Sequence, residues 1–117
     1  TMGNFLFEES EVVQFIEPAQ LEQWLSQGDA PLIINVTGEE SALVECSLIA
    51  DKPLSVPITE FASVINELDP DQPTVVVCQL GQKSFNAAQR LIESDYSCVF
   101  SLHGGLEAWK RMLEGSQ

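Results

Sequence analysis

Short apolar runs along the chain alternate with stretches in which apolar residues recur every three or four positions. The first pattern predicts β-strands over residues 12–16, 32–36, 54–56, 74–77 and 96–102. The second pattern predicts helices that begin near Pro18, Thr59, Ser84 and Leu106. Between residues 37 and 52 the pattern is weak and indicates at most a short helix around residues 42–46.

The order of these elements predicts the fold class. Strands that alternate with helices of about ten residues imply crossover connections, and therefore a mostly parallel sheet of about five strands with helices on both faces. A length of 117 residues suits a single core. We expect one domain over residues 11–115, preceded at residues 1–10 by an extended lead-in whose Thr1-Met2 start resembles a tag remnant.

The chain is strongly acidic, with 5 Lys and Arg against 18 Asp and Glu and a net charge of -13. Its basic residues form no cluster beyond the pair Lys110-Arg111, which argues against nucleic acid or an anionic membrane as a partner. No apolar run has the length of a membrane span and the amino end lacks a signal-peptide pattern, so we expect a cytoplasmic protein. The acidity is interpreted as a solubilising surface, and a surface that repels small anions or prefers a basic partner is the alternative.

Three cysteines, Cys46, Cys78 and Cys98, show no CxxC spacing and accompany a single His. This set argues against a metal site, and the odd number without a secretory signal favours reduced thiols. Cys98 lies in a predicted strand and is interpreted as a core residue. Cys46 lies in the weakly patterned stretch, where a redox or resolving role stays open.

Cys78 follows the most apolar predicted strand, and in open parallel sheets ligands bind beyond the carboxyl ends of strands. The connection to the next helix is Gln79-Leu80-Gly81-Gln82-Lys83-Ser84. Backbone amides of such a loop, together with the positive end of a helix dipole, can converge on an anion. We therefore expect Cys78 to be a thiolate at neutral pH, with Lys83 as a nearby cation. The loop alone leaves open the alternative of an inert, buried thiol at a strand end.

Three segments, residues 75–84, 87–91 and 99–109, resemble the second half of single-domain rhodaneses. The pattern of that family is C-x-x-G-x-R-S, an alanine-rich helix, and L-x-G-G-I-x-A-W. Here it is represented by Cys78, Gly81 and Ser84, and then by Gly104-Gly105 and Trp109 at the matching spacing. The resemblance extends over about residues 12–113 and implies a rhodanese-like fold.

What the resemblance implies is a sulfurtransferase. The Cys78 thiolate would take sulfane sulfur from a donor, hold it as a persulfide within the loop of residues 79–84, and pass it to a nucleophile. No cofactor is expected beyond this covalent persulfide, and the expected partners are a small sulfane-sulfur donor or a protein donor or acceptor. Phosphatases with a similar loop need Arg six positions after the cysteine to grip phosphate, and Ser84 stands there. Phosphate chemistry is therefore not expected.

The chain departs from the family pattern at several positions. Lys83 stands where Arg is usual, Asn35-Val36-Thr37 replaces Asp-Val-Arg, and the usual His-x-Pro-Gly-Ala is unrecognisable in residues 48–56. Fewer cations and a negative net charge predict weak use of an oxyanion donor such as thiosulfate, and favour a protein or polysulfide donor. The alternative is a module that no longer turns over and serves in binding, regulation or redox sensing. His103 is interpreted as an exposed turn residue, and Leu106 and Trp109 as core.

Overall fold

A five-stranded parallel sheet forms the centre of the protein. The computed structural model describes residues 13–28, 30–37, 49 and 53–115. The strands are β1 (Gln14–Ile16), β2 (Leu32–Asn35), β3 (Leu54–Ser55), β4 (Thr74–Val77) and β5 (Val99–Leu102). Their order in the sheet is β1-β5-β4-β2-β3, and every neighbouring pair is parallel. The predicted α/β class with a mostly parallel sheet is confirmed.

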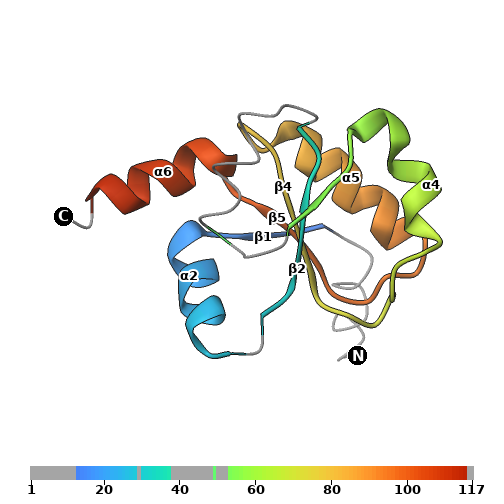
Figure 1. Ribbon diagram of the computed structural model, residues 1–117, viewed down its shortest axis with the longest axis horizontal. Helices are drawn as coiled ribbons and strands as arrows, with labels where there is room; N and C mark the ends of the chain where they lie inside the picture. The colour runs from blue at the N-terminus through green and yellow to red at the C-terminus, as the bar shows by residue number, and fades with distance from the viewer. Residues whose placement is uncertain (1–12, 29, 38–48, 50–52, 116–117) are drawn as a thin grey trace, which may run out of the picture.

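Helices cover both faces of this sheet (Figure 1). The helical segments are α2 (Pro18–Ser26), the 3-10 turn η2 (Ile58–Glu60), α4 (Phe61–Ile65), α5 (Gln82–Glu93) and α6 (Gly105–Gly115). Helices α2 and α6 pack on one face with their apolar sides, whereas α4 and α5 pack on the other. No helix within the described residues is long and apolar enough to cross a membrane.

The central strand β4 contributes to both cores. Val75 and Val77 pack on the side of α2 and α6, and Val76 packs on the side of α4 and α5. All three side chains are 0% exposed, because a parallel sheet with helices on both faces leaves neither face to water. Burial of each such side chain contributes about 1.5–3 kcal/mol to stability. The packing of β4 on both faces therefore fixes the backbone position of Cys78, which follows it directly.

Four predicted strands are longer than the observed ones: β2 and β3 end one residue earlier than predicted, and β5 and β1 begin later. The ladder of β5 begins at Val99, because the Tyr96 hydroxyl donates to the Ile65 carbonyl and the Ser97 amide donates to the Pro70 carbonyl at 3.0 Å. Tyr96 and Ser97 are therefore bonded to the end of α4 and to the segment after it instead of to a neighbouring strand. In β1 the ladder begins at Gln14, and residue 12 lies outside the described part of the chain.

Two predicted helix caps are wrong. Thr59 lies inside η2, which starts after Pro57, and α4 begins only at Phe61. Proline fixes a φ suited to the start of a helical turn, which explains the earlier start. Helix α5 begins at Gln82 after a left-handed Gly81, so Ser84 lies inside its first turn and is buried. The proposed lead-in at residues 1–10 and Cys46 lie outside the described residues.

Candidate active site

Cys78 lies immediately after β4, at the point of the sheet where ligands are expected. The chain leaves β2 toward β3 on one side and leaves β4 toward β5 on the other, so the carboxyl ends of β2 and β4 form the topological switch point of the sheet. Thr37 lies just beyond β2 and Cys78 just beyond β4, and both line one pocket. The structure therefore places Cys78 at the predicted edge of the sheet.

Two backbone amides donate hydrogen bonds to the Cys78 sulfur. The backbone amides of Gly81 and Ser84 donate to Sγ at 3.0 and 3.2 Å, and the Ser84 hydroxyl lies 3.4 Å from it. Only 2% of Cys78 is exposed, so these contacts are made in a largely dry environment where electrostatic interactions are strong. The arrangement stabilises negative charge on sulfur. Of the six residues predicted to form an amide cradle, Gly81 and Ser84 make these contacts within the described chain.

The backbone of the loop depends on Gly81. Its φ of +102° lies in the left-handed region, which side chains with a Cβ rarely adopt. This conformation turns the chain from β4 directly into α5, so that the amides of Gly81 and Ser84 point back to the sulfur. Ser84 is the third residue of α5, and its amide is one of those that the first turn of a helix leaves without an internal partner.

The first turn of α6 holds this loop from the other side. The Leu106 amide donates to the Cys78 carbonyl at 2.8 Å, and the Glu107 amide donates to the Gln79 carbonyl at 3.1 Å. Gly105, with φ of +66°, permits this approach, because a Cβ there would lie 2.4 Å from the Cys78 carbonyl oxygen. The Gly-Gly pair that the sequence presents as a turn therefore positions the loop. Sequence reasoning missed this role, and the fixed spacing of the two motifs was the only signal for it.

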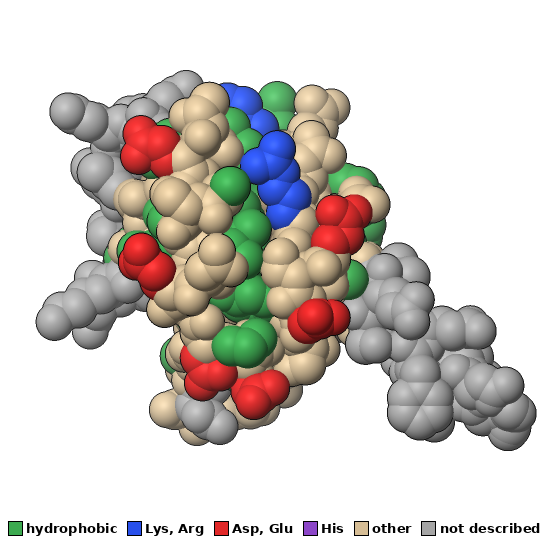
Figure 2. Space-filling model, turned by 90° about the vertical axis from the view of Figure 1, so that its right-hand side faces the viewer, with side chains coloured by type: hydrophobic (Ala, Val, Ile, Leu, Met, Phe, Trp, Pro, Cys, Tyr) green, Lys and Arg blue, Asp and Glu red, His purple; other side chains and the backbone are tan. Residues whose placement is uncertain are grey.

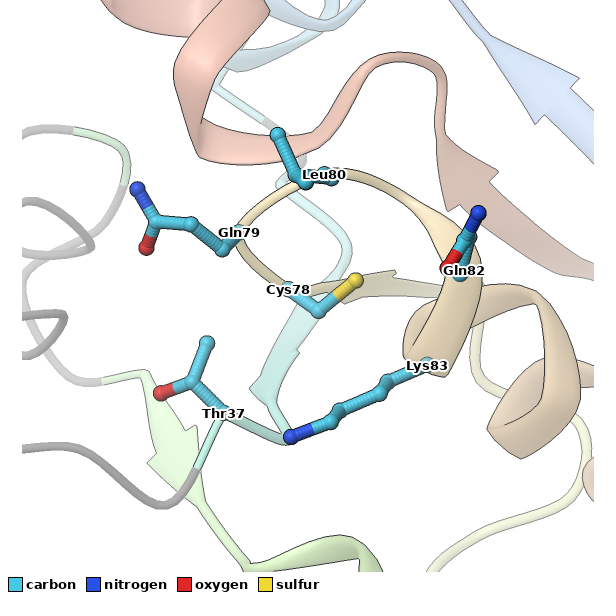
Figure 3. Close-up of a pocket in the computed structure, with 6 residues that line it drawn as sticks. All are labelled: Thr37, Cys78, Gln79, Leu80, Gln82 and Lys83. Carbon is cyan, nitrogen blue, oxygen red and sulfur yellow. The ribbon is translucent and has the colours of Figure 1, made fainter.

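A pocket of about 130 Å³ opens beside the sulfur. It is lined by Cys78 together with Thr37, Gln79, Leu80, Gln82 and Lys83 (Figure 3). Leu80 is 66% exposed and forms an apolar rim. Figure 3 shows the Lys83 side chain directed away from the sulfur, so Lys83 lines the pocket without approaching Sγ in this conformation. Lys83 makes no ion pair within the described residues.

The unusual Asn35-Val36-Thr37 segment is held by neutral hydrogen bonds. Asn35 is 1% exposed, and its Oδ1 accepts a hydrogen bond from the Thr37 amide at 3.0 Å. Its Nδ2 lies 3.5 Å from the hydroxyl of Ser55 in β3. These contacts fix the end of β2 beside the pocket, but they place no charge there.

His103 and Cys98 do not line the pocket beside Cys78. His103 is exposed, and its Nδ1 lies 2.9 Å from Glu17 Oε2. Cys98 is partly buried just before β5, and this burial raises the pKa of its thiol above the ordinary value. Within the described residues no three His, Cys, Asp or Glu side chains are grouped as a metal site would require. The buried side chains of Leu106 and Trp109 belong to the core, as predicted.

Comparisons with known proteins agree with this architecture. The family model of the rhodanese-like domain matches residues 17–112. Thiosulfate sulfurtransferase GlpE from Shewanella oneidensis is 50% identical over 49 residues, which are 42% of this chain and 48% of that protein. The match spans about half the length of that relative.

Solved structures show the same fold. A rhodanese-related protein from Thermoplasma volcanium superposes with a TM-score of 0.71 at 22% identity, over 85% of this chain and 92% of that one. The human single domain sulfurtransferase superposes with a TM-score of 0.70 at 18% identity, over 85% of this chain and 96% of that one. The family match over most of the chain, together with a five-stranded sheet that carries Cys78 in its loop, establishes that this chain belongs to the rhodanese-like domain family.

Proposed function

We propose that the protein is a sulfurtransferase or sulfur carrier that moves sulfane sulfur through a persulfide on Cys78. The observation that carries this proposal is the convergence of the Gly81 and Ser84 backbone amides on Sγ, at 3.0 and 3.2 Å. Two backbone amides that donate to one sulfur suit a nucleophilic cysteine, which reacts as the thiolate. The half-length match to a thiosulfate sulfurtransferase supports the same chemistry.

The proposed reaction has two steps. In the first, the Cys78 thiolate attacks the sulfane sulfur of the donor, an S–S bond forms to Sγ, and the donor leaves with the electron pair of its broken bond, as sulfite or a thiolate. In the second, an acceptor nucleophile attacks the terminal sulfur, and the Cys78 thiolate leaves. Sulfur passes from donor to acceptor without an added oxidant or reductant. The chemistry uses no cofactor, and a reducing compartment such as the cytoplasm would keep the thiol available.

The pocket offers few cations to an oxyanion donor such as thiosulfate. Among the described residues that line it, Lys83 is the single cation, and its side chain extends away from the sulfur (Figure 3). Asn35 and Thr37 supply neutral groups at the end of β2, where an oxyanion would need cations. On the face formed by α4 and α5, acidic side chains lie around a small group of basic ones (Figure 2). With a net charge of -13, long-range repulsion opposes small anionic donors in general. We therefore propose a protein as donor, or a persulfide or polysulfide, which lacks the sulfonate oxygens that need cations in the pocket.

The test is to load the purified protein with thiosulfate or with polysulfide and then to add cyanide. We expect a mass increase of about 32 Da, one sulfur atom, on the peptide that contains Cys78, and release of thiocyanate after cyanide is added. Cys78→Ala should lose both signals. Cys98→Ala is the matched control and should keep both, because Cys98 lies outside the pocket. Absence of the adduct with every donor tested rules out the sulfur-carrier role.

The second candidate function is a rhodanese-like module without turnover that senses oxidants through the same thiol. The position of the Lys83 ammonium and the neutral Asn35 favour it, since both leave an oxyanion substrate without a charged partner at the sulfur. This candidate predicts rapid modification of Cys78 by hydrogen peroxide but no thiocyanate release with any donor. The loading experiment therefore separates the two candidates.

A further inference from the structure

Ser101 belongs to a buried hydroxyl chain that ends at the Cys78 sulfur. The Ser101 Oγ lies 2.8 Å from the Ser84 Oγ, which in turn lies 3.4 Å from Sγ. Both serines are 0% exposed. They come from different elements, because Ser84 lies in the first turn of α5 and Ser101 lies in β5, paired with Val76 of β4. A polar side chain that is buried inside a strand costs free energy unless it makes a hydrogen bond, so the bond between Ser101 and Ser84 is what makes Ser101 tolerable there.

The protons of this chain can be assigned from its partners. Ser101 Oγ has one hydrogen-bond partner within the described residues, the Ser84 Oγ. A buried hydroxyl that does not donate is unfavourable, so Ser101 donates its proton to Ser84. Ser84 then has its own single proton free for either the Gly81 carbonyl at 3.2 Å or Sγ at 3.4 Å.

We infer that Ser101 is a positioning residue that fixes Ser84 as a hydrogen-bond donor to the Cys78 sulfur. When Sγ carries the negative charge, the charge draws the Ser84 proton toward it, because hydrogen bonds to ionised acceptors are the stronger ones. The bond from Ser101 polarises Ser84 and strengthens its donation. When sulfur is added, the charge moves to the terminal atom, and the Ser84 proton can return to the Gly81 carbonyl. The last step rests on the proposed persulfide, whereas the donor role of Ser101 does not.

The opposite proton arrangement makes a different prediction. If Ser84 donated to Ser101, removing Ser101 would release the Ser84 proton and increase donation to Sγ. The two arrangements therefore predict opposite changes in the amount of Cys78 thiolate. Lys83 is the one charged group among the described residues that line the pocket beside Cys78, and it is unchanged in every variant considered.

The test is the rate of Cys78 alkylation as a function of pH, measured for the Cys78 peptide by mass spectrometry without any sulfur donor. We expect Ser101→Ala to slow alkylation at neutral pH about threefold and to move the midpoint of the pH profile upward. Ser84→Ala, which removes the donor itself, should slow it about tenfold. Ser101→Thr retains a hydroxyl and should restore the profile if the added methyl group is accommodated.

A double-mutant cycle keeps the inference testable if a variant is partly destabilised. In the Ser84→Ala background, Ser101→Ala should have no further effect on the alkylation profile, because its influence passes through Ser84. Faster alkylation in Ser101→Ala, or an effect that persists without the Ser84 hydroxyl, would overturn the inference. Neither outcome depends on persulfide formation, so failure of this inference is distinct from failure of the proposed function.

Discussion

Replacement of Gly105 by alanine tests the contact between α6 and the Cys78 loop. The new Cβ would lie 2.4 Å from the Cys78 carbonyl oxygen and 2.5 Å from that of Gln79. Both atoms belong to the backbone, so no side chain can move aside to make room. The loop and the start of α6 must separate by about 1 Å to restore ordinary contact, at the cost of the hydrogen bonds from Leu106 and Glu107.

The size of the effect follows from these changes. A left-handed φ for a residue with a Cβ costs about 1–2 kcal/mol, and each lost backbone hydrogen bond costs about 0.5–1.5 kcal/mol. We therefore expect Gly105→Ala to lower the free energy of unfolding by about 2–5 kcal/mol. A domain of this size has only about 5–15 kcal/mol in total, so the loss is large.

Gly28 offers a matched control for this experiment. It also has a positive φ, +87°, but a Cβ there would meet no atom within 4 Å. Gly28→Ala should therefore cost only the conformational part, about 1–2 kcal/mol. The assay is urea denaturation of both variants followed by circular dichroism, with thiocyanate release as a second measurement. Equal losses of unfolding free energy in the two variants would refute the steric argument for Gly105.

Three further predictions follow from other contacts. Tyr96→Phe should destabilise the protein by about 1 kcal/mol at pH 7 through loss of the bond to Ile65. Burial, with a contribution from Asp69, raises the pKa of Tyr96 above its ordinary value of 10.0. The stabilisation from the Tyr96 hydroxyl is therefore complete below pH 10.0 and is lost as the pH rises through the raised pKa. Urea titrations at increasing pH should show the unfolding free energies of wild type and variant converging above pH 10.0. Thr37→Arg, which adds a cation to the pocket, should lower the KM for thiosulfate several-fold in steady-state assays, and an unchanged KM would contradict the proposed charge deficit. Because burial raises the pKa of the Cys98 thiol, peptide mapping should show slower alkylation of Cys98 than of Cys78 at pH 7, and equal rates would contradict the assignment.

The sequence predicted the central part of the fold better than its connections. Strand β4 was predicted at its observed bounds, Thr74–Val77, because β-branched residues buried on both faces leave an uninterrupted apolar run. The location of Cys78 at the ligand-binding edge of the sheet follows from this prediction, because Cys78 comes directly after the carboxyl end of β4. By contrast, Tyr96 resembled a strand residue because it is apolar and buried, although its hydroxyl bonds to Ile65, which is distant in the sequence.

Roles that depend on contacts between distant segments could not be predicted. The pattern around Ser84 is that of a helix cap, but the structure buries its hydroxyl between Cys78 and Ser101, a partner 17 residues away. Gly105 looks like an ordinary turn glycine until the carbonyls of the Cys78 loop are placed against it. Lys83 was expected beside the sulfur from its position in the loop, but the direction of a long, exposed side chain is not encoded by spacing (Figure 3).

The hydrogen bond from the Ser84 amide to Sγ also has a consequence for α5. The residue before helix α5 is Gly81, which has no side chain to cap the helix, and the Cys78 sulfur accepts the hydrogen bond that a cap would accept. The interaction between the helix end and a negative charge on sulfur is mutual, so it stabilises the first turn of α5 by the same free energy by which it stabilises the charge. Alkylation of Cys78 should therefore loosen the first turn of α5, and hydrogen exchange at its amides would report the chemical state of the sulfur without a probe attached to it.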